Sequence, residues 1–180
     1  VFVPELSSTA WHLGAPTVRT RGAEARRYNR PYLAQRMPQS RWLRATPGRV
    51  WDVPFVQAVV DVADADFEVA RSCVDRLLMN DEEDLHVSLV GPWGRLHDTR
   101  RPVLDDEHRE LYMLAEWYRT EPRVHLVEQA PADVFPAPFR LDVDVRTGIR
   151  RSTVRRLVAE ADGRKVGRVR VLSLHGGTES

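Results

Sequence analysis

The 180-residue sequence predicts an α/β fold, and two observations lead to that class. Short valine-rich runs alternate with stretches whose apolar residues recur at helical spacing, as in sheets built from β-α-β units. The composition, with 42% hydrophobic and 29% charged residues, is typical of a globular chain. No apolar run approaches the roughly 18 residues that span a bilayer. The single cysteine, Cys73, excludes an internal disulfide framework and a cysteine-based zinc cluster.

The first predicted elements follow from about Trp51 onward. Residues 55–62 form a valine-rich run that is typical of a buried strand. Asp64 or Asp66 is placed to cap the next helix. That helix has an apolar face made of Phe67, Ala70, Val74, Leu77 and Leu78. Residues 85–90 form a second strand, which ends at a Gly-Pro turn.

The later elements repeat this alternation. A helix capped by Asp105 or Asp106 ends before Pro122, and strands follow over residues 124–127 and 139–145. A further helix is capped by Ser152, and the last predicted strand covers residues 165–174. This order predicts a largely parallel or mixed sheet. Ligands of such sheets bind outside the carboxyl ends of the strands. Here those ends are residues 61–66, 91–96 and 128–133.

Charge separates a basic arm from the predicted sheet. Residues 19–49 carry nine arginines and one acid, a net charge of +8, whereas residues 50–180 carry 18 basic and 24 acidic residues, a net charge of −6. Residues 15–49 contain four prolines, Pro16, Pro31, Pro38 and Pro47, which are too closely spaced for a long helix. We therefore expect an extended arm, with a turn or two of helix over residues 26–36.

Three segments carry a resemblance to a known family. They are VVDVADA at 59–65, FEVARSCVDRLLMNDEEDLHVSLVG at 67–91 and DDEHRELYMLAEWYRTEPRVHLV at 105–127. Together they resemble the nucleotide-binding half of family 2 glycosyltransferases, which have a GT-A fold. The resemblance implies a three-layer α/β sandwich with a mixed, mostly parallel sheet.

The amino-terminal segment VFVPELSSTAWHLG adds a second resemblance, to the last strand and loop of a catalytic GT-A domain. We therefore expect residues 1–14 to be the end of an upstream domain. Residues 15–50 then form an arginine- and proline-rich arm or linker, and residues 51–180 form the GT-A-like domain.

The resemblance implies transfer of a sugar from a nucleotide-sugar donor to an acceptor, with Mn²⁺ or Mg²⁺ on the diphosphate. It points to His12 as a metal ligand and to Asp61 and Asp64 as cofactor-binding residues. The chain departs from the family after its second strand, where Val90-Gly91-Pro92-Trp93 replaces a pair of aspartates. The family's catalytic base would precede Val1. The catalytic residues thus stay unknown, and we expect this chain to be inactive alone.

Several of these residues also have simpler interpretations. His12 could pack in a loop beneath Trp11, and Asp64 and Asp66 could serve only as helix caps. Asp142 and Asp144 lie on an alternating strand, which favours a solvated face. Cys73 lies beside an apolar helix face and is interpreted as a buried, unreactive thiol.

The arm has three interpretations. Its tyrosines and tryptophan lie among arginines, a mixture that could bind single-stranded nucleic acid or anionic lipid. We favour a third one, in which Tyr28, Pro31, Tyr32, Leu33 and Met37 anchor the arm along an acidic surface of the domain. Nucleic acid is then an unlikely partner, and peripheral membrane contact stays open.

Two alternatives to a transferase remain. One is a non-catalytic, degenerate GT-A-like interaction module that could form a homo-oligomer. The other is binding of nucleic acid or an anionic surface through residues 19–49. The opening residues lack the shape of a signal peptide, so the predicted location is the cytoplasm, with contact at the inner membrane face left open.

Overall fold

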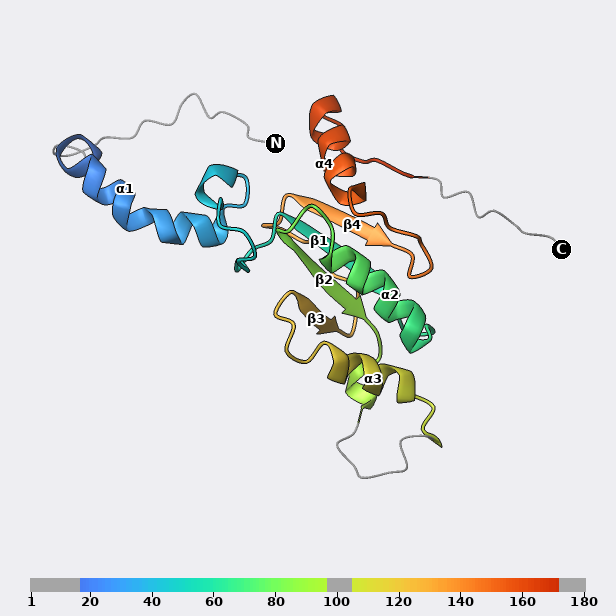
Figure 1. Cartoon of the computed structure of the whole chain (residues 1–180). Coiled ribbons are helices and arrows are strands. Elements are labelled where there is room, and N and C mark those ends of the chain that lie inside the picture. The colour runs from blue at the N-terminus through green and yellow to red at the C-terminus, as the bar shows by residue number, and fades with distance from the viewer. Residues whose placement is uncertain (1–16, 97–104, 172–180) are drawn as a thin grey trace, which may run out of the picture.

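The computed structural model describes residues 17–96 and 105–171 (Figure 1). The predictions for residues 1–14, including the metal ligand His12, lie outside the described part of the chain.

The described core is a four-stranded sheet in which all neighbours are parallel. Its strands are β1 (Val56–Asp61), β2 (Leu85–Val90), β3 (Val124–Val127) and β4 (Phe139–Val143), in the order β3-β2-β1-β4. Val56 of β1 pairs with Leu85 of β2 on one side and with Phe139 of β4 on the other. The α/β class and the parallel sheet are therefore confirmed, and β2 and β3 have the predicted bounds.

Helices α2 (Phe67–Leu78) and α3 (Arg109–Trp117) pack on one face of this sheet, and α4 (Thr153–Arg164) joins the same core through Val154. All three contribute to a single core with alternate residues of the strands. Its fully buried side chains include Val60, Leu77, Leu89 and Leu114. The described residues thus form two layers, a sheet and a helix layer, and the second helix layer of the predicted sandwich is not among them.

The opposite face of the sheet is mostly polar, apart from valines such as Val59, which pairs in register with Ser88. Its members on the two central strands include Gln57, which donates a 3.1 Å hydrogen bond to the Ser88 hydroxyl. Beside them, Nδ1 of His86 and Nε2 of His125 lie 3.2 Å apart, and Ser88 is paired in register with His125. A parallel sheet normally carries apolar residues on both faces. This one has polar contacts where a second helix layer would require apolar side chains.

Two local predictions are wrong. Residues 165–171 form no strand, because α4 ends at Lys165 in the left-handed conformation (φ 51°) and the chain continues exposed and unpaired. The predicted caps of α2 and α4 also fail: Asp66 and Ser152 stand at the N-cap positions of these helices, yet neither side chain makes a capping hydrogen bond. Before α3, by contrast, the Asp106 side chain accepts a 2.8 Å hydrogen bond from the amide of His108.

The arm also differs from its prediction. Residues Thr17–Arg36 form helix α1, which contains Pro31 and is kinked at Arg21. A short 3₁₀ helix, η1 (Arg41–Leu43), follows. Helix α1 projects from the sheet and its helices (Figure 1), and the five predicted anchors, Tyr28, Pro31, Tyr32, Leu33 and Met37, are exposed. The expectation that these five side chains anchor the arm on the domain is therefore wrong.

The arm is instead joined to the domain at its carboxyl-terminal end, through Arg44. Its side chain is 1% exposed and donates to the carbonyls of Ala34 (2.6 Å), Gln35 (3.0 Å) and Val53 (2.8 Å). It also forms a 2.8 Å ion pair with Asp84, at the start of β2. A buried guanidinium with this many partners fixes the last turn of α1 against the body.

Candidate functional site

The strand order reverses at the carboxyl ends of β1 and β4, and we call this edge of the sheet the crevice. The chain moves from β1 to β2 and β3 on one side, and then returns across the sheet to β4 on the other. Parallel sheets commonly bind ligands beyond the carboxyl ends of their strands, at the point where the strand order reverses. The candidate site is therefore the edge where β1 and β4 end.

Asp61 ends β1 at this edge and is exposed. Its Oδ1 accepts a 3.0 Å hydrogen bond from the amide of Ala63, which closes an Asx turn. Asp64 follows in the same turn and is also exposed. The structure thus brings the two predicted cofactor-binding residues together in one exposed turn at the crevice.

The first turn of α2, which leaves this crevice, is held by a residue that the sequence did not indicate. Glu110 of α3 accepts a 2.9 Å hydrogen bond from the amide of Phe67. This hydrogen bond, together with one from Arg109, lowers the pKa of Glu110 below its usual value. Since Glu110 lies 43 residues away in the sequence, no local capping pattern could have revealed it.

Two more carboxylates end β4. Val60 pairs with Val143, so Asp61 and Asp144 are the next residues on two neighbouring parallel strands. Asp144 accepts a 2.8 Å hydrogen bond from the amide of Arg146, and Asp142 accepts one of 2.8 Å from the Arg140 side chain. Both aspartates are exposed, as predicted, and the strand order adds that they border the crevice.

The carboxyl ends of β2 and β3 differ because protein groups fill them. The Trp93 indole donates a 2.9 Å hydrogen bond to the carbonyl of Leu89. A Cβ on Gly91 would lie 3.3 Å from the Trp93 ring, so only glycine fits easily beneath it. Beyond β3, Glu128 accepts a hydrogen bond from the amide of Gly94. In the segment after β2, where the resembling family has paired aspartates, these backbone groups are thus hydrogen-bonded within the protein.

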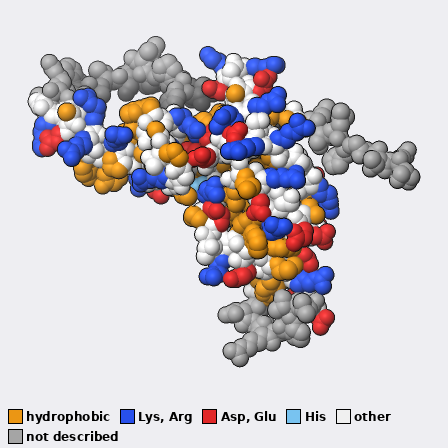
Figure 2. Space-filling model, viewed as in Figure 1, with side chains coloured by type: hydrophobic (Ala, Val, Ile, Leu, Met, Phe, Trp, Pro, Cys, Tyr) orange, Lys and Arg blue, Asp and Glu red, His pale blue; other side chains and the backbone are white. Residues whose placement is uncertain are grey.

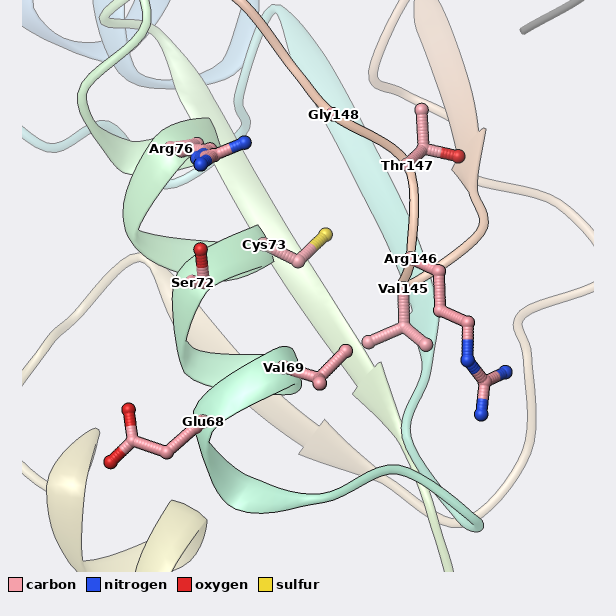
Figure 3. Close-up of a pocket in the computed structure, with 9 residues that line it drawn as sticks. All are labelled: Glu68, Val69, Ser72, Cys73, Arg76, Val145, Arg146, Thr147 and Gly148. Carbon is pink, nitrogen blue, oxygen red and sulfur yellow. The ribbon is translucent and has the colours of Figure 1, made fainter. Parts of the chain in front are cut away.

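A cavity of about 280 Å³ lies between α2 and the segment after β4 (Figure 3). Val69, Cys73 and Val145 point toward one another across it, whereas Glu68 points away. Burial, with a smaller contribution from Asp144, raises the pKa of the Cys73 thiol to about 11. The thiol therefore stays protonated near neutral pH, which agrees with the interpretation of Cys73 as unreactive.

The described residues do not fit a divalent metal. No three histidine, cysteine or carboxylate side chains among residues 17–96 and 105–171 lie close enough together to hold one. The carboxylates at the crevice accept hydrogen bonds from neighbouring groups instead. His12, the metal ligand predicted from the sequence, lies outside the described residues.

Comparison with known proteins adds no relative. No protein-family model matches the chain, and a search of curated proteins finds no match. Among the helices in the described ranges, none combines the length and apolar character needed to cross a membrane. The candidate site therefore rests on strand order and on the side chains at its edge.

Proposed function

We propose that this chain is a glycosyltransferase, or part of one, and that the crevice at β1 and β4 receives the nucleotide end of a sugar donor. The observation that carries the proposal is the strand order β3-β2-β1-β4, because it puts the reversal point beside Asp61 and Asp64. The resemblance of residues 59–127 to the nucleotide-binding half of family 2 glycosyltransferases supports the same assignment.

Exposed carboxylates at this edge suit hydroxyl groups better than phosphates. A carboxylate accepts hydrogen bonds from ribose or sugar hydroxyls, and the Asx turn already orients that of Asp61. The diphosphate would be repelled by Asp61 and Asp144 unless a cation neutralised it. Since the described residues do not complete a metal site, its further ligands would come from elsewhere in the chain or from the donor.

Calorimetric titration of the full chain with UDP and GDP, with and without Mn²⁺, tests this proposal. We expect binding that requires Mn²⁺ and weakens at least tenfold in Asp61→Asn and Asp64→Asn, on the scale of about 1–2 kcal/mol for a lost charged hydrogen bond. The side-chain amide oxygen introduced by Asp61→Asn can still accept the hydrogen bond from Ala63, so the turn keeps its shape. Asp162→Asn, at the exposed far end of α4, is the matched control.

His12→Ala extends the same titration to the predicted metal ligand. Loss of the Mn²⁺ requirement or of binding in this variant would support the role of His12. Binding that is equal in the unsubstituted chain and in every variant would place the nucleotide away from this edge. No binding at millimolar nucleotide would reject the proposal.

A second candidate, the non-catalytic interaction module, is favoured by the closed ends of β2 and β3. There, Trp93 and Glu128 take the backbone groups that a ligand would otherwise contact. This candidate predicts no nucleotide binding and a homo-oligomer. Sedimentation of the full chain across a range of concentrations measures the oligomer directly.

A further inference from the structure

Helix α1 carries several exposed arginines that the domain does not neutralise. Arg26, Arg27, Arg30 and Arg36 are all exposed, and none has a carboxylate partner in the part of the chain that the structure describes. The one ion pair found within the described part of α1 joins Arg21 to Glu24. Figure 2 shows basic side chains along the projecting helix. Four unpaired guanidiniums on one helix are complementary in charge to a partner that carries several negative charges.

Exposed aromatic rings lie among these arginines. Tyr28 is 68% exposed and Tyr32 53% exposed, and their ring centroids are 5.4 Å apart. Trp42, in η1 at the end of the arm, is 76% exposed. Rings of this size leave much apolar surface in contact with water unless a flat partner covers them. A polyanion with flat apolar groups would satisfy both the rings and the arginines.

The distribution of residues around α1 decides between two such partners. At 3.6 residues per turn, Arg36 projects between Tyr32 and Leu33. A helix that lies on a membrane keeps its apolar and basic residues on separate faces. Here a lipid-facing side would have to bury this arginine, whereas a nucleic-acid strand needs phosphate contacts and stacking surfaces side by side.

We propose that α1 and η1 bind single-stranded nucleic acid, with Arg26, Arg27, Arg30 and Arg36 on phosphates and with Tyr28, Tyr32 and Trp42 stacked on bases. This site shares no residue with the crevice at β1 and β4. The nucleic-acid proposal can therefore be tested independently of the proposed transferase function. The contacts go to backbone phosphates and base faces, so binding depends little on sequence.

The test is fluorescence anisotropy of a labelled oligo(dT) of about 20 nucleotides with the full chain. Between about 50 and 200 mM salt we expect a slope of log K against log salt near −3, because four phosphate contacts release about 0.7 counterion each. The double variant Tyr28→Ala/Tyr32→Ala should lose at least tenfold in affinity with the slope unchanged. Arg26→Gln/Arg30→Gln should lose affinity and flatten the slope.

The matched control removes the same charge from another basic region. Arg156 on α4 and Arg168 beyond it are both exposed, and Arg156→Gln/Arg168→Gln should keep binding within about twofold. All the substituted side chains are exposed, so circular dichroism should report the same fold in every variant. Absence of binding at low salt overturns the proposal, as does binding that the α1 variants leave unchanged.

Vesicles test the competing surface. Co-sedimentation with phosphatidylglycerol–phosphatidylcholine vesicles should be weak beside binding to the oligonucleotide. Tight association with these vesicles, lost in Tyr28→Ala/Tyr32→Ala and accompanied by no oligonucleotide binding, would assign α1 to a lipid surface and overturn the nucleic-acid proposal.

Discussion

Helix α1 and the helices on the sheet show opposite patterns of burial. Leu77 of α2 and Leu114 of α3 are fully buried, whereas Ala34 is the one buried side chain among residues 20–36 of α1. Since apolar burial is the main source of folding free energy, the body holds nearly all of the stability. The side chains of α1 contribute little to folding, and their surface remains available to a partner.

The largest effect should come from a cavity in the body. Leu77→Ala removes a fully buried side chain from the core, and we expect a loss of about 3–4 kcal/mol in the free energy of unfolding. Urea denaturation followed by circular dichroism measures it. The same substitution in α1, Leu33→Ala, should change stability by under about 0.5 kcal/mol. Equal losses in the two variants would remove the contrast between arm and body.

The second-largest loss of stability should come from Arg44, which joins α1 to the body. Arg44→Met keeps the length of the side chain but leaves Asp84, whose side chain is 9% exposed, without its closest cation. We expect a loss of about 3 kcal/mol, because removing one partner of a buried ion pair strands the other charge. Arg36→Met, on an exposed arginine of α1, is the control and should be neutral. Proteolysis within α1 should also become faster in Arg44→Met alone.

A pH effect of intermediate size should come from the polar face of the sheet. Burial, followed by the neighbouring His125, lowers the pKa of His86 to about 4. The unfolded chain takes up this proton near pH 6.5, so stability is full above that pH and falls as the pH drops toward 4. At about pH 5 the loss from this group is on the order of 2 kcal/mol.

The comparison that isolates His86 is the difference between the free energies of unfolding at about pH 7 and pH 5. This difference should be smaller in His86→Gln than in the unsubstituted chain, because glutamine takes up no proton. An equal difference in the two proteins would show that the imidazole does not destabilise the fold when it is protonated.

The smallest effect should be on the stability of α1 variants. Tyr28→Ala/Tyr32→Ala should change the free energy of unfolding by under about 0.5 kcal/mol, since both rings are more than half exposed. A loss above about 2 kcal/mol would mean that these rings pack on the body in solution, as the sequence first indicated.

The sequence predicted best those elements whose signals are local. The bounds of β2 and β3 were correct because each strand is a short apolar run with turn residues at its ends. The strand expected at 165–174 failed over its described part, because alternation shows only that a segment could pair and not that a partner edge is available. Proline spacing misjudged α1, since Pro31 is accommodated within an exposed helix.

The residues of the candidate site also separate into those that local signals predict and those that depend on tertiary packing. Asp61 and Asp64 could be placed at a strand end from the sequence, and the structure puts both there. The neighbours of Asp61 could not be predicted, because nothing in the sequence says that β4 pairs with β1 and so brings Asp144 alongside. The same holds for Glu110, whose role in holding α2 depends on the packing of α3.

The two edge strands of the sheet, β3 and β4, bear on the tendency of the protein to aggregate. Within the described residues β3 and β4 each pair on one side only, so each leaves backbone donors and acceptors open to another chain. Strand β3 is four residues long, and β4 displays the ion pair of Arg140 and Asp142. Short edge strands with charged side chains are poor templates for pairing with a second molecule. The open edges of this sheet are therefore protected from recruiting strands of other chains.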